Sequence, residues 1–600
     1  MHRQIATSLL TAIFLMGGTV NANATDSPKT DSKPASPFGD VSSKDARPPT
    51  VTGRHGMVTG TTGAAAIAGG VEVLKQGGSA ADAAMATAMT QICMAAGSWV
   101  SYAGILTMVY FDAASGKTYN LNAAYNTVKG ETDPKSIPGI DVAALMAGGF
   151  AGVKAAPSGR TALVPGFMAG VEAAHERFGK VPLETVFAPA IRCAEEGFPY
   201  DTGFDQRVKF RKDVLDRLPE TKAVFTKPDG SAYQVGDTFR QPALAATLRT
   251  AAKQGIGNYL YRGPWARKLV DLVQKDGGKL TTEDLANYRA IWSEPVHTAY
   301  HGYEIYAHGQ PADGGVNLIE AMRLVDRAGI SSMGPYATSP LALYWLAEIS
   351  KAATLFSLGA ADARPALETA VGAPLSLESR IDPKTTDKIW QAIQARKIPT
   401  LQPPKTLPAH SDGVVAVDQW GNIAAVVHSI NTVSWGWTGI FVDGISIPDS
   451  ASFQQDAMAR VVPGERLPDP TNPGLVVKNG KPFMGFSSIG SGLHLRTISA
   501  LVSVIDYGLS PQDAINQPAL GIYLPKPDAK PPGSDFLGLT VGANEFSADY
   551  KSQAAALGLN LIDQDATRGY WIGIQIDPKS GELRGGAIRE LALGGRAVGY

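Results

Sequence analysis

The segment from His410 to Asn431 contains the residues whose types and spacing could carry out covalent catalysis. A serine near its start is followed by an apolar strand, a Gly421-Asn422 turn and a second apolar strand. If the chain is cleaved between His410 and Ser411, Ser411 provides a hydroxyl nucleophile, and its freed α-amine provides a general base. The pattern therefore predicts a self-cleaving hydrolase whose nucleophile is the new N-terminal residue.

The composition is that of an ordinary globular protein. The chain has 600 residues, of which 44% are hydrophobic and 18% charged, and its formal net charge is −1. This length predicts about two to four domain-sized units or one large layered body. Because the net charge is close to zero, no long-range field attracts nucleic acid or an anionic membrane, and we expect neither as a partner.

The N-terminal segment differs from the rest of the chain. His2-Arg3 precedes an apolar run over residues 5–20, and a group of small residues ends at Ala24. This order predicts a secretory signal peptide over residues 1–24, because a membrane anchor needs roughly 18 uninterrupted apolar residues. Residues 25–50 are rich in Ser, Pro, Asp and Lys and are expected to form a disordered leader. We therefore expect an exported protein, periplasmic or extracellular, without stable membrane insertion.

Cofactor chemistry has no signature in the sequence. The nine histidines are dispersed without metal-ligand spacing, and neither a P-loop nor a dinucleotide-binding fingerprint is present. We therefore expect no metal and no cofactor. The two cysteines, Cys93 and Cys193, lie in apolar, helix-like segments, so a disulfide and a pair of buried free thiols both remain open.

Hydrophobic periodicity predicts the elements that position the His410–Asn431 segment. Residues 63–96 indicate two packed helices separated at Gly77-Gly78-Ser79, and residues 105–111 indicate a buried strand. A Pro-rich link over residues 399–408 precedes the proposed cleavage point. The other expected elements are a hairpin partner at 118–121, helices within 160–290 (including 244–252, 265–273 and one starting at Thr281), strands within 414–445, and helices at 496–507 and 511–516. Helical and strand-rich blocks around one sheet system predict an α+β layered fold.

Ordered motifs along most of the chain carry a family resemblance. They lie at residues 74–84, 164–166, 197–199, 285–289, 314–315, 417–422, 505–508 and 595–600. From about Gly56 to Tyr600 the chain resembles the γ-glutamyltransferase (γ-glutamyltranspeptidase) family of N-terminal-nucleophile hydrolases. The resemblance implies a four-layer αββα sandwich made by one precursor that cleaves itself into a large subunit, residues 51–410, and a small subunit, residues 411–600.

The resemblance also assigns candidate site residues. The family nucleophile is the first Thr of a Thr-Thr-His run, and an ungapped alignment places Ser411, Asp412 and Gly413 there. Asn431 aligns with an Asn near the substrate, and Ser429 aligns with a supporting Thr.

The remaining assignments follow from the same alignment. Ile489 and Gly490 align with the family's oxyanion glycines, so their backbone N–H groups are expected to stabilise the oxyanion, with Ser491 beside the substrate. With a one-residue gap, Asp449 aligns with the acid that holds the substrate amine.

At the substrate-binding positions the chain departs from the family pattern in two places. Ala124 stands where relatives have the Arg that binds the glutamyl α-carboxylate, and Leu467-Pro468-Asp469-Pro470 replaces a Ser-Ser pair. Ala cannot replace a bidentate Arg, although Arg496 could supply one from elsewhere. The expected substrate is a small-molecule amide or peptide. It is a glutathione-type γ-glutamyl compound by family resemblance, and the alternatives are an acylase or amidohydrolase acting on a non-glutamyl amide, or a non-catalytic binding protein.

Four aromatic or imidazole side chains near this segment have open roles. Trp435 and Trp437 follow Asn431 and could line the pocket or cover the core. His428 and His494 lie near the aligned site, where packed histidines are more common than catalytic ones.

Overall fold

The computed structural model describes residues 48–140, 156–358, 360–399, 411–490, 494–523, 536–563, 570–588 and 594–600. The expected signal peptide, most of the expected leader, His410 and Ser491 lie outside these ranges. In the described part of the chain, no helix is both long enough and apolar enough to cross a membrane.

Two antiparallel sheets of seven described strands each form the centre of the molecule. The first sheet has the order β21 (Arg596–Gly599), β2 (Met57–Gly60), β10 (Ser411–Val417), β11 (Ile423–Ser429), β3 (Ile105–Asp112), β4 (Lys117–Ala123) and β7 (Ile291–Ser293). The second has the order β1 (Val51–Gly53), β20 (Leu583–Gly586), β19 (Tyr570–Ile576), β15 (Lys481–Ile489), β14 (Gly474–Lys478), β9 (Tyr303–Ala307) and β8 (Val296–Tyr300). Each sheet therefore combines strands from before and after the proposed cleavage point.

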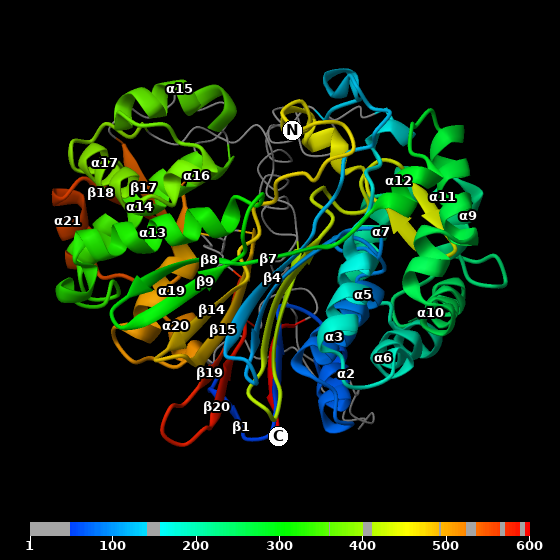
Figure 1. The fold of residues 1–600 in the computed structure, drawn as a ribbon, viewed down its shortest axis with the longest axis horizontal. Helices are drawn as coiled ribbons and strands as arrows, with labels where there is room; N and C mark the ends of the chain where they lie inside the picture. Colours follow the sequence, from blue (N-terminus) through cyan, green and yellow to red (C-terminus); the bar gives the residue numbers. More distant parts are fainter. Residues whose placement is uncertain are drawn as a thin grey trace, which may run out of the picture.

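A helical layer covers the outer face of each sheet (Figure 1). The layer on the first sheet contains α2 (Ala64–Lys75), α3 (Ala80–Met94), α5 (Phe167–Phe178), α6 (Leu183–Glu196), α10 (Pro242–Gln254) and α11 (Pro264–Lys275). The layer on the second contains α13 (Gly314–Ala328), α14 (Pro340–Leu358), α17 (Pro383–Gln394), α19 (Leu495–Ile505), α20 (Pro511–Ile515) and α21 (Ala548–Ala556). The expected α+β fold, a four-layer αββα sandwich, is confirmed.

Smaller elements complete the described structure. They are α7 (Thr202–Phe210), α8 (Lys212–Leu215), α9 (Pro219–Val224), α12 (Thr282–Asn287), α15 (Ala360–Val371), α16 (Leu377–Arg380), α18 (Gln455–Met458), β5 (Phe198–Pro199), β6 (Thr238–Phe239), β12 (Ile440–Val442), β13 (Ile445–Ile447), β16 (Leu520–Ile522), β17 (Leu537–Val541) and β18 (Leu559–Asp563). The short β12–β13 hairpin and the three-stranded sheet of β16, β17 and β18 lie outside the two main sheets.

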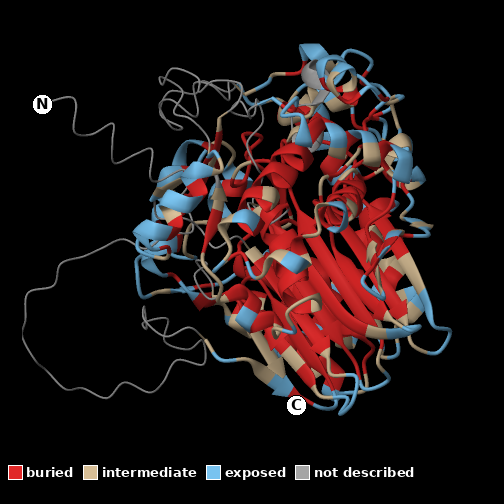
Figure 2. Ribbon diagram, turned by 90° about the vertical axis from the view of Figure 1, so that its left-hand side faces the viewer, coloured by how far each residue is buried: buried red, intermediate tan, exposed pale blue. Residues whose placement is uncertain are grey.

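Strand β10 is buried on both faces because it lies in the interior of a sandwich. Successive side chains of a strand point to opposite faces. Val414 and Ala416 accordingly join the core under α3, whereas Val415 and Val417 join the core between the two sheets. Figure 2 shows the buried sheets running through the centre of the molecule. The apolar sequence of β10 is thus explained by two-sided burial.

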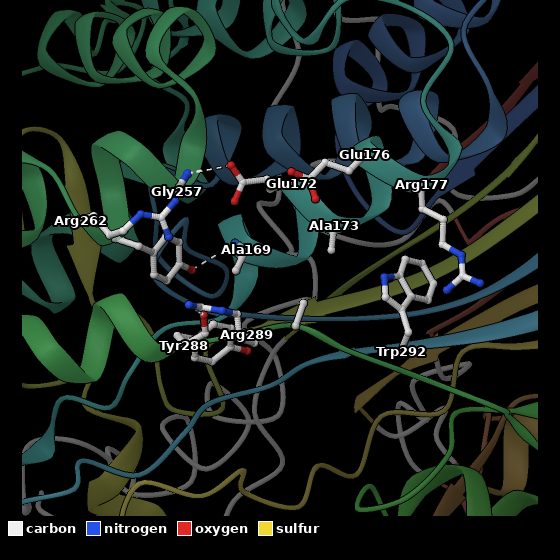
Figure 3. A pocket seen from close by; sticks show the side chains of 12 residues that line it. Ala169, Glu172, Ala173, Glu176, Arg177, Gly257, Arg262, Tyr288, Arg289 and Trp292 are labelled. Atoms are coloured by element: carbon white, nitrogen blue, oxygen red, sulfur yellow. Dashed lines mark hydrogen bonds between the residues drawn. The ribbon is translucent and has the colours of Figure 1, made fainter.

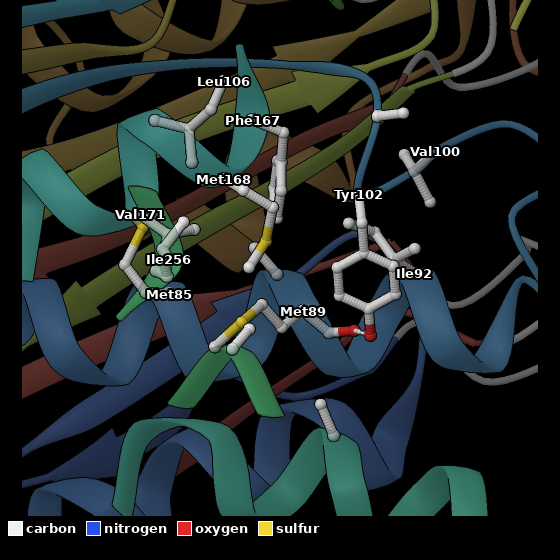
Figure 4. Close-up of a cluster of buried hydrophobic side chains, with 14 of the residues drawn as sticks. Met85, Met89, Ile92, Val100, Tyr102, Leu106, Phe167, Met168, Val171 and Ile256 are labelled. Carbon is white, nitrogen blue, oxygen red and sulfur yellow. Dashed lines mark hydrogen bonds between the residues drawn. The ribbon is translucent and has the colours of Figure 1, made fainter. Parts of the chain in front are cut away.

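The α2–α3 pair forms as the sequence predicts. Ser79 accepts a hydrogen bond from the backbone N–H of Asp82, and the Asp82 side chain accepts one from the backbone of Ser79, which is a capping box. Gly77 has φ +89°, a conformation that favours glycine at a helix end. Met89 of α3 packs beside Phe167 and Met168 of α5 in the core under the first sheet (Figure 4).

Other local predictions on the described residues also agree with the structure, whereas the expected Pro-rich link lies outside them from residue 400 onward. Strand β3 pairs with β4, helices α10 and α11 cover the expected segments, and Thr281 caps α12 through a second capping box. Cys93 is buried, Cys193 is partly buried, and both thiols are free.

Candidate active site

Three of the predicted site residues form one hydrogen-bonded chain. Ser411 is the first residue of β10 and lies opposite Ser429 of β11 in the strand register. The Ser411 hydroxyl donates to the Ser429 hydroxyl at 2.9 Å, and Ser429 Oγ accepts the backbone N–H of Asn431 at 3.0 Å. Asn431 has φ +51°, which Asn tolerates better than most residues. The structure therefore brings the candidate nucleophile and two expected substrate-side residues together.

The turn at the other end of the hairpin sets this register. Asp418 Oδ1 accepts the backbone N–H groups of Trp420 and Asn422, both at 3.0 Å, and Gly421 has φ +86°. These local bonds fix the loop length between β10 and β11. Because hairpin register depends on the turn, they also fix Ser411 opposite Ser429.

Two aspartates that sequence reasoning did not assign to the site continue the chain. Asn431 Nδ2 donates to Asp469 Oδ2 at 2.8 Å, and the Asp469 backbone carbonyl accepts the N–H of Asp313 at 3.1 Å. Loss of hydration raises the pKa of Asp469. The same cause raises the pKa of Asp313 to about 7, with Arg380 opposing the shift and Asp469 adding to it. Asn431 therefore lies beside one buried carboxyl group, Asp469, whose backbone is bonded to that of Asp313.

The expected oxyanion residues lie at the end of β15 that approaches Ser411. A Cβ atom on Gly485 would lie 2.8 Å from Val415 Cγ1, and one on Gly413 would lie 2.5 Å from Ser487 Oγ. Val415 thus faces Gly485, and Gly413, two residues earlier in β10, faces Ser487, two residues later in β15. The next step leads to Ser411 and Ile489, and Gly490 follows with φ +55°.

The structure places Asp449 against its own loop. Its carboxylate accepts hydrogen bonds from the Thr432 hydroxyl at 2.6 Å, the Trp437 backbone N–H at 3.0 Å and the Ser452 hydroxyl at 3.1 Å. Burial raises its pKa, and the nearby Arg211 opposes that shift. The contacts of Asp449 hold residues 432–437 in place, separately from the Ser411–Asn431 chain.

The open roles of the neighbouring aromatic residues are resolved by packing. Trp435 belongs to a buried aromatic cluster with Phe198, Phe204 and Phe441, so it covers the core. Trp437 lies under the Arg211 guanidinium, with 4.5 Å between that group and the ring centroid.

Neither histidine of interest is a charged base. His428 is fully buried on the helix side of the first sheet, where its Nε2 lies 2.8 Å from Gln91 Oε1 and burial lowers its pKa to about 3. His494 precedes α19, and burial and Arg380 lower its pKa to about 4. With pKa values this low, both imidazoles are weak bases, and His428 lies on the face of the sheet opposite to the Ser411 hydroxyl.

Two arginines could be considered as replacements for the one missing at Ala124, and both are already engaged elsewhere. Arg466 donates to Asn122 and Asn126 side chains, each at 2.7 Å, and to the Arg289 carbonyl at 2.6 Å. Arg496 is buried and donates to the Ile515 carbonyl. Arg496 therefore contacts α20, and its guanidinium does not replace the missing arginine beside Ala124.

A separate groove of about 490 Å³ is lined by residues between positions 169 and 292. Its lining includes Glu172 and Arg177 of α5, Tyr261 of η4 (Gly257–Tyr261) and Trp292 of β7 (Figure 3). None of the predicted site residues lines it, so its charged rim is unrelated to the Ser411 chain.

Comparisons with known proteins find relatives in sequence and in fold. The glutathione hydrolase proenzyme of Escherichia coli K12 is 26% identical over 511 residues, which cover 78% of this chain and 81% of the relative. The Acylase ACY 1 proenzyme of Pseudomonas sp. SE83 is 28% identical over 374 residues, covering 59% and 63%. The crystal structure of cephalosporin acylase from Bacillus halodurans has the same fold, with TM-score 0.73, 22% identity and coverage of 96% and 99%.

A family-level match extends over most of the chain. Residues 64–588 match the family described as Gamma-glutamyltranspeptidase. The protein therefore belongs to the gamma-glutamyltranspeptidase family and is an amide hydrolase or acyltransferase of the N-terminal-nucleophile class.

Proposed function

We propose that this protein is exported, cleaves itself between His410 and Ser411, and uses Ser411 as its nucleophile. The observation that carries the proposal is the position of Ser411 at the start of a central strand, with its hydroxyl bonded to Ser429. Each sheet combines strands of both future subunits, so cleavage would leave the fold held by hydrogen bonds on both sides of the break.

The chemistry follows from the groups around Ser411. The Ser411 Oγ–H bond breaks as Oγ attacks the amide carbonyl, and the freed α-amine accepts the proton. Backbone N–H groups of Ile489 and Gly490 would hold the oxyanion, a contribution of about 3–4 kcal/mol per donor. The C–N bond then breaks, the leaving amine takes the proton, and water or an amine releases the acyl group from the serine ester. Asn431, Ser429 and Ser491 would contact the substrate, and Asp449 supports the neighbouring loop.

The processing step is tested with purified mature protein. A denaturing gel and N-terminal sequencing should show a small fragment that begins at Ser411, and Ser411→Ala should remain one chain. A fragment with another N-terminus would assign the nucleophile elsewhere. Intact mass measurement of the large fragment tests export independently, because signal removal after Ala24 gives a defined mass.

The site favours a second candidate substrate class, a non-glutamyl amide. The Asp469 carboxyl group lies beside Asn431, while Ala124 supplies no cation and Arg466 is engaged by backbone and amide oxygens. A substrate α-carboxylate there would meet the Asp469 carboxyl group with no cation to offset it, and its binding would be unfavourable. The γ-glutamyl class rests on the relatives named glutathione hydrolase.

A panel of acyl anilides separates these classes. Simple acyl anilides should turn over faster than γ-glutamyl anilide in the wild type. Asp469→Asn removes one negative charge at similar volume and should raise the relative rate on γ-glutamyl anilide by about tenfold. Efficient γ-glutamyl turnover by the wild type, lost in Ser411→Ala, would instead establish the glutamyl class.

A further inference from the structure

The residue after the candidate nucleophile carries a fully buried carboxylate. Asp412 follows Ser411 in β10, and side chains alternate along a strand, so its carboxylate points toward the helical layer. Asp412 is 0% exposed. Its Oδ1 accepts the hydroxyls of Thr61 at 2.9 Å and Thr62 at 2.7 Å, and its Oδ2 accepts Trp99 Nε1 at 3.0 Å.

The three donors to this carboxylate are neutral groups. Burial raises the pKa of Asp412 to about 6, although the three hydrogen bonds oppose the shift. In the described part of the chain no Lys or Arg forms an ion pair with it. Its cross-strand neighbour, His428, is neutral because burial lowers the histidine pKa to about 3. Keeping a carboxylate here is costly for stability, so its retention calls for another role.

The Asp412 contacts act on the backbone that carries Ser411. The Thr61 hydroxyl donates to Asp412 and also accepts the Gly413 backbone N–H at 2.9 Å. The Thr61 backbone N–H donates to the Gly413 carbonyl at 3.1 Å. One threonine therefore binds two successive residues of β10, and Trp99 holds the carboxylate from the other side.

A terminal residue needs such fixation. Once the chain is cleaved before Ser411, nothing covalent restrains that residue from its N-terminal side, and chain ends fray unless they are tied down. Displacement of a catalytic group by about 1 Å costs on the order of 100-fold in rate. Fixing Asp412 restricts the Cα of Ser411, and thereby both its hydroxyl and its amine.

We propose that Asp412 is the positioning residue for the N-terminal nucleophile, holding Ser411 through Thr61, Thr62 and Trp99. The inference rests on the proposed function of Ser411. Asp412 acts through the backbone and does not touch the substrate, since it lies on the face of the sheet opposite to the Ser411 hydroxyl.

Asp418 provides a matched control at the other end of the same strand. It is also buried, and it accepts the Ala80 backbone N–H at 2.9 Å and Asn422 Nδ2 at 2.8 Å. Asp418 holds the turn, six positions away from Asp412 in the same hairpin.

The test compares Asp412→Asn with Asp418→Asn. In Asp412→Asn the new amide brings an N–H toward a site filled by donors, so the first residues of β10 shift. We expect kcat per processed molecule to fall by about 10- to 100-fold, with KM within about threefold and Tm unchanged or higher. Asp418→Asn keeps the side-chain oxygen that accepts the Trp420 and Asn422 N–H groups, so the turn and the register are retained. It loses the second acceptor oxygen and should lower Tm and leave kcat unchanged.

A second variant covers the case in which Asp412→Asn fails to mature. Trp99→Phe removes one donor and keeps an aromatic ring, and kcat should fall by about three- to tenfold. Amide exchange of residues 412–414 should quicken in both variants. Loss of self-cleavage in Asp412→Asn with Tm retained would support the positioning role, because cleavage also needs Ser411 in place.

Two results would overturn the inference. One is a wild-type kcat in both Asp412→Asn and Trp99→Phe, and the other is a kcat loss that merely follows Tm, as in a general structural defect. N-terminal sequencing of the wild-type small fragment distinguishes an incorrect role for Asp412 from an incorrect proposed function for Ser411. A fragment starting at Ser411 together with unaffected variants refutes only the role of Asp412.

Discussion

The two ends of β10 are both held by a buried aspartate, but the partners of these aspartates come from different places. At the turn end, Asp418 accepts backbone N–H groups two and four residues away, together with one N–H from a distant segment, that of Ala80. At the nucleophile end, the three donors to Asp412 all lie more than 300 residues earlier in the chain. The turn end is thus fixed largely by local sequence, and the catalytic end depends on the assembled sandwich.

The largest expected effect tests whether the N-terminal end of β10 carries the catalytic nucleophile. Ser411→Ala removes the attacking hydroxyl, so amide hydrolysis should fall by at least about 10⁴-fold and no small fragment should appear. Initial rates and a denaturing gel measure both effects. Ser411→Thr, which keeps a hydroxyl, is the control and should retain cleavage. Full activity in Ser411→Ala would show that Ser411 is not the nucleophile, and that neither end of β10 carries the catalytic hydroxyl.

The pH dependence of stability should show whether the carboxylate at the nucleophile end titrates. The folded pKa of Asp412 is raised to about 6, above its unfolded value. Its stabilising contribution is therefore present below about pH 4 and is lost as pH rises through about 6, a decrease of about 3 kcal/mol in the free energy of unfolding.

Urea unfolding between pH 4 and 7 isolates this contribution when two uncleaved proteins are compared. One protein carries Ser411→Ala alone, and the other carries Ser411→Ala together with Asp412→Asn. The free energy of unfolding should decrease with pH in the first protein, and this decrease should be smaller by about 3 kcal/mol in the second. Parallel curves for the two proteins would contradict a buried, titrating Asp412.

An intermediate effect is expected for the hydroxyl that contacts Ser411. Ser429→Ala removes the 2.9 Å hydrogen bond and should lower kcat by about 10- to 100-fold, because the Ser411 hydroxyl loses its orientation. Ser429→Thr should restore most of the rate. Steady-state kinetics on the better anilide substrate checks both variants. An unchanged rate in Ser429→Ala would show that Ser429 has no role in catalysis.

The smallest expected effect lies at the turn end. Gly421 has φ +86°, so Gly421→Ala should lower the free energy of unfolding by about 1 kcal/mol without changing kcat. Thermal unfolding in the Ser411→Ala background measures the first quantity, and rates in the self-cleaving protein measure the second. A fall in kcat equal to that of Ser429→Ala would show that turn geometry reaches the nucleophile.

Much of the site could be predicted because it is local. The Gly421-Asn422 turn and the apolar strands on either side of it place Ser411 beside Ser429, and Asn431 follows directly. The N-termini of α3 and α12 could be predicted for the same reason, because Ser79 and Thr281 bind residues only three positions ahead.

Other parts of the site could not be predicted from local patterns. Asp469 contacts Asn431 from 38 residues away in the sequence. Asp313, at the start of α13, donates its backbone N–H to Asp469. The alignment marked Asp469 only as part of a segment that replaces a serine pair. A hint for Asp412 existed, because a charged residue at the start of an apolar strand must find partners when it is buried.

The sequence by itself determined the four layers, the hairpin and the identity of the candidate nucleophile. Periodicity, turn residues and family motifs are local patterns, so they can be recognised without the tertiary structure. Only the tertiary structure decided what surrounds Ser411. It turned Asp412 toward Thr61, Thr62 and Trp99, bonded Asp449 to its own loop, and placed the Asp469 carboxyl group beside Asn431. The reason is that partners of a buried charge are chosen by packing between layers, and that packing joins segments hundreds of residues apart.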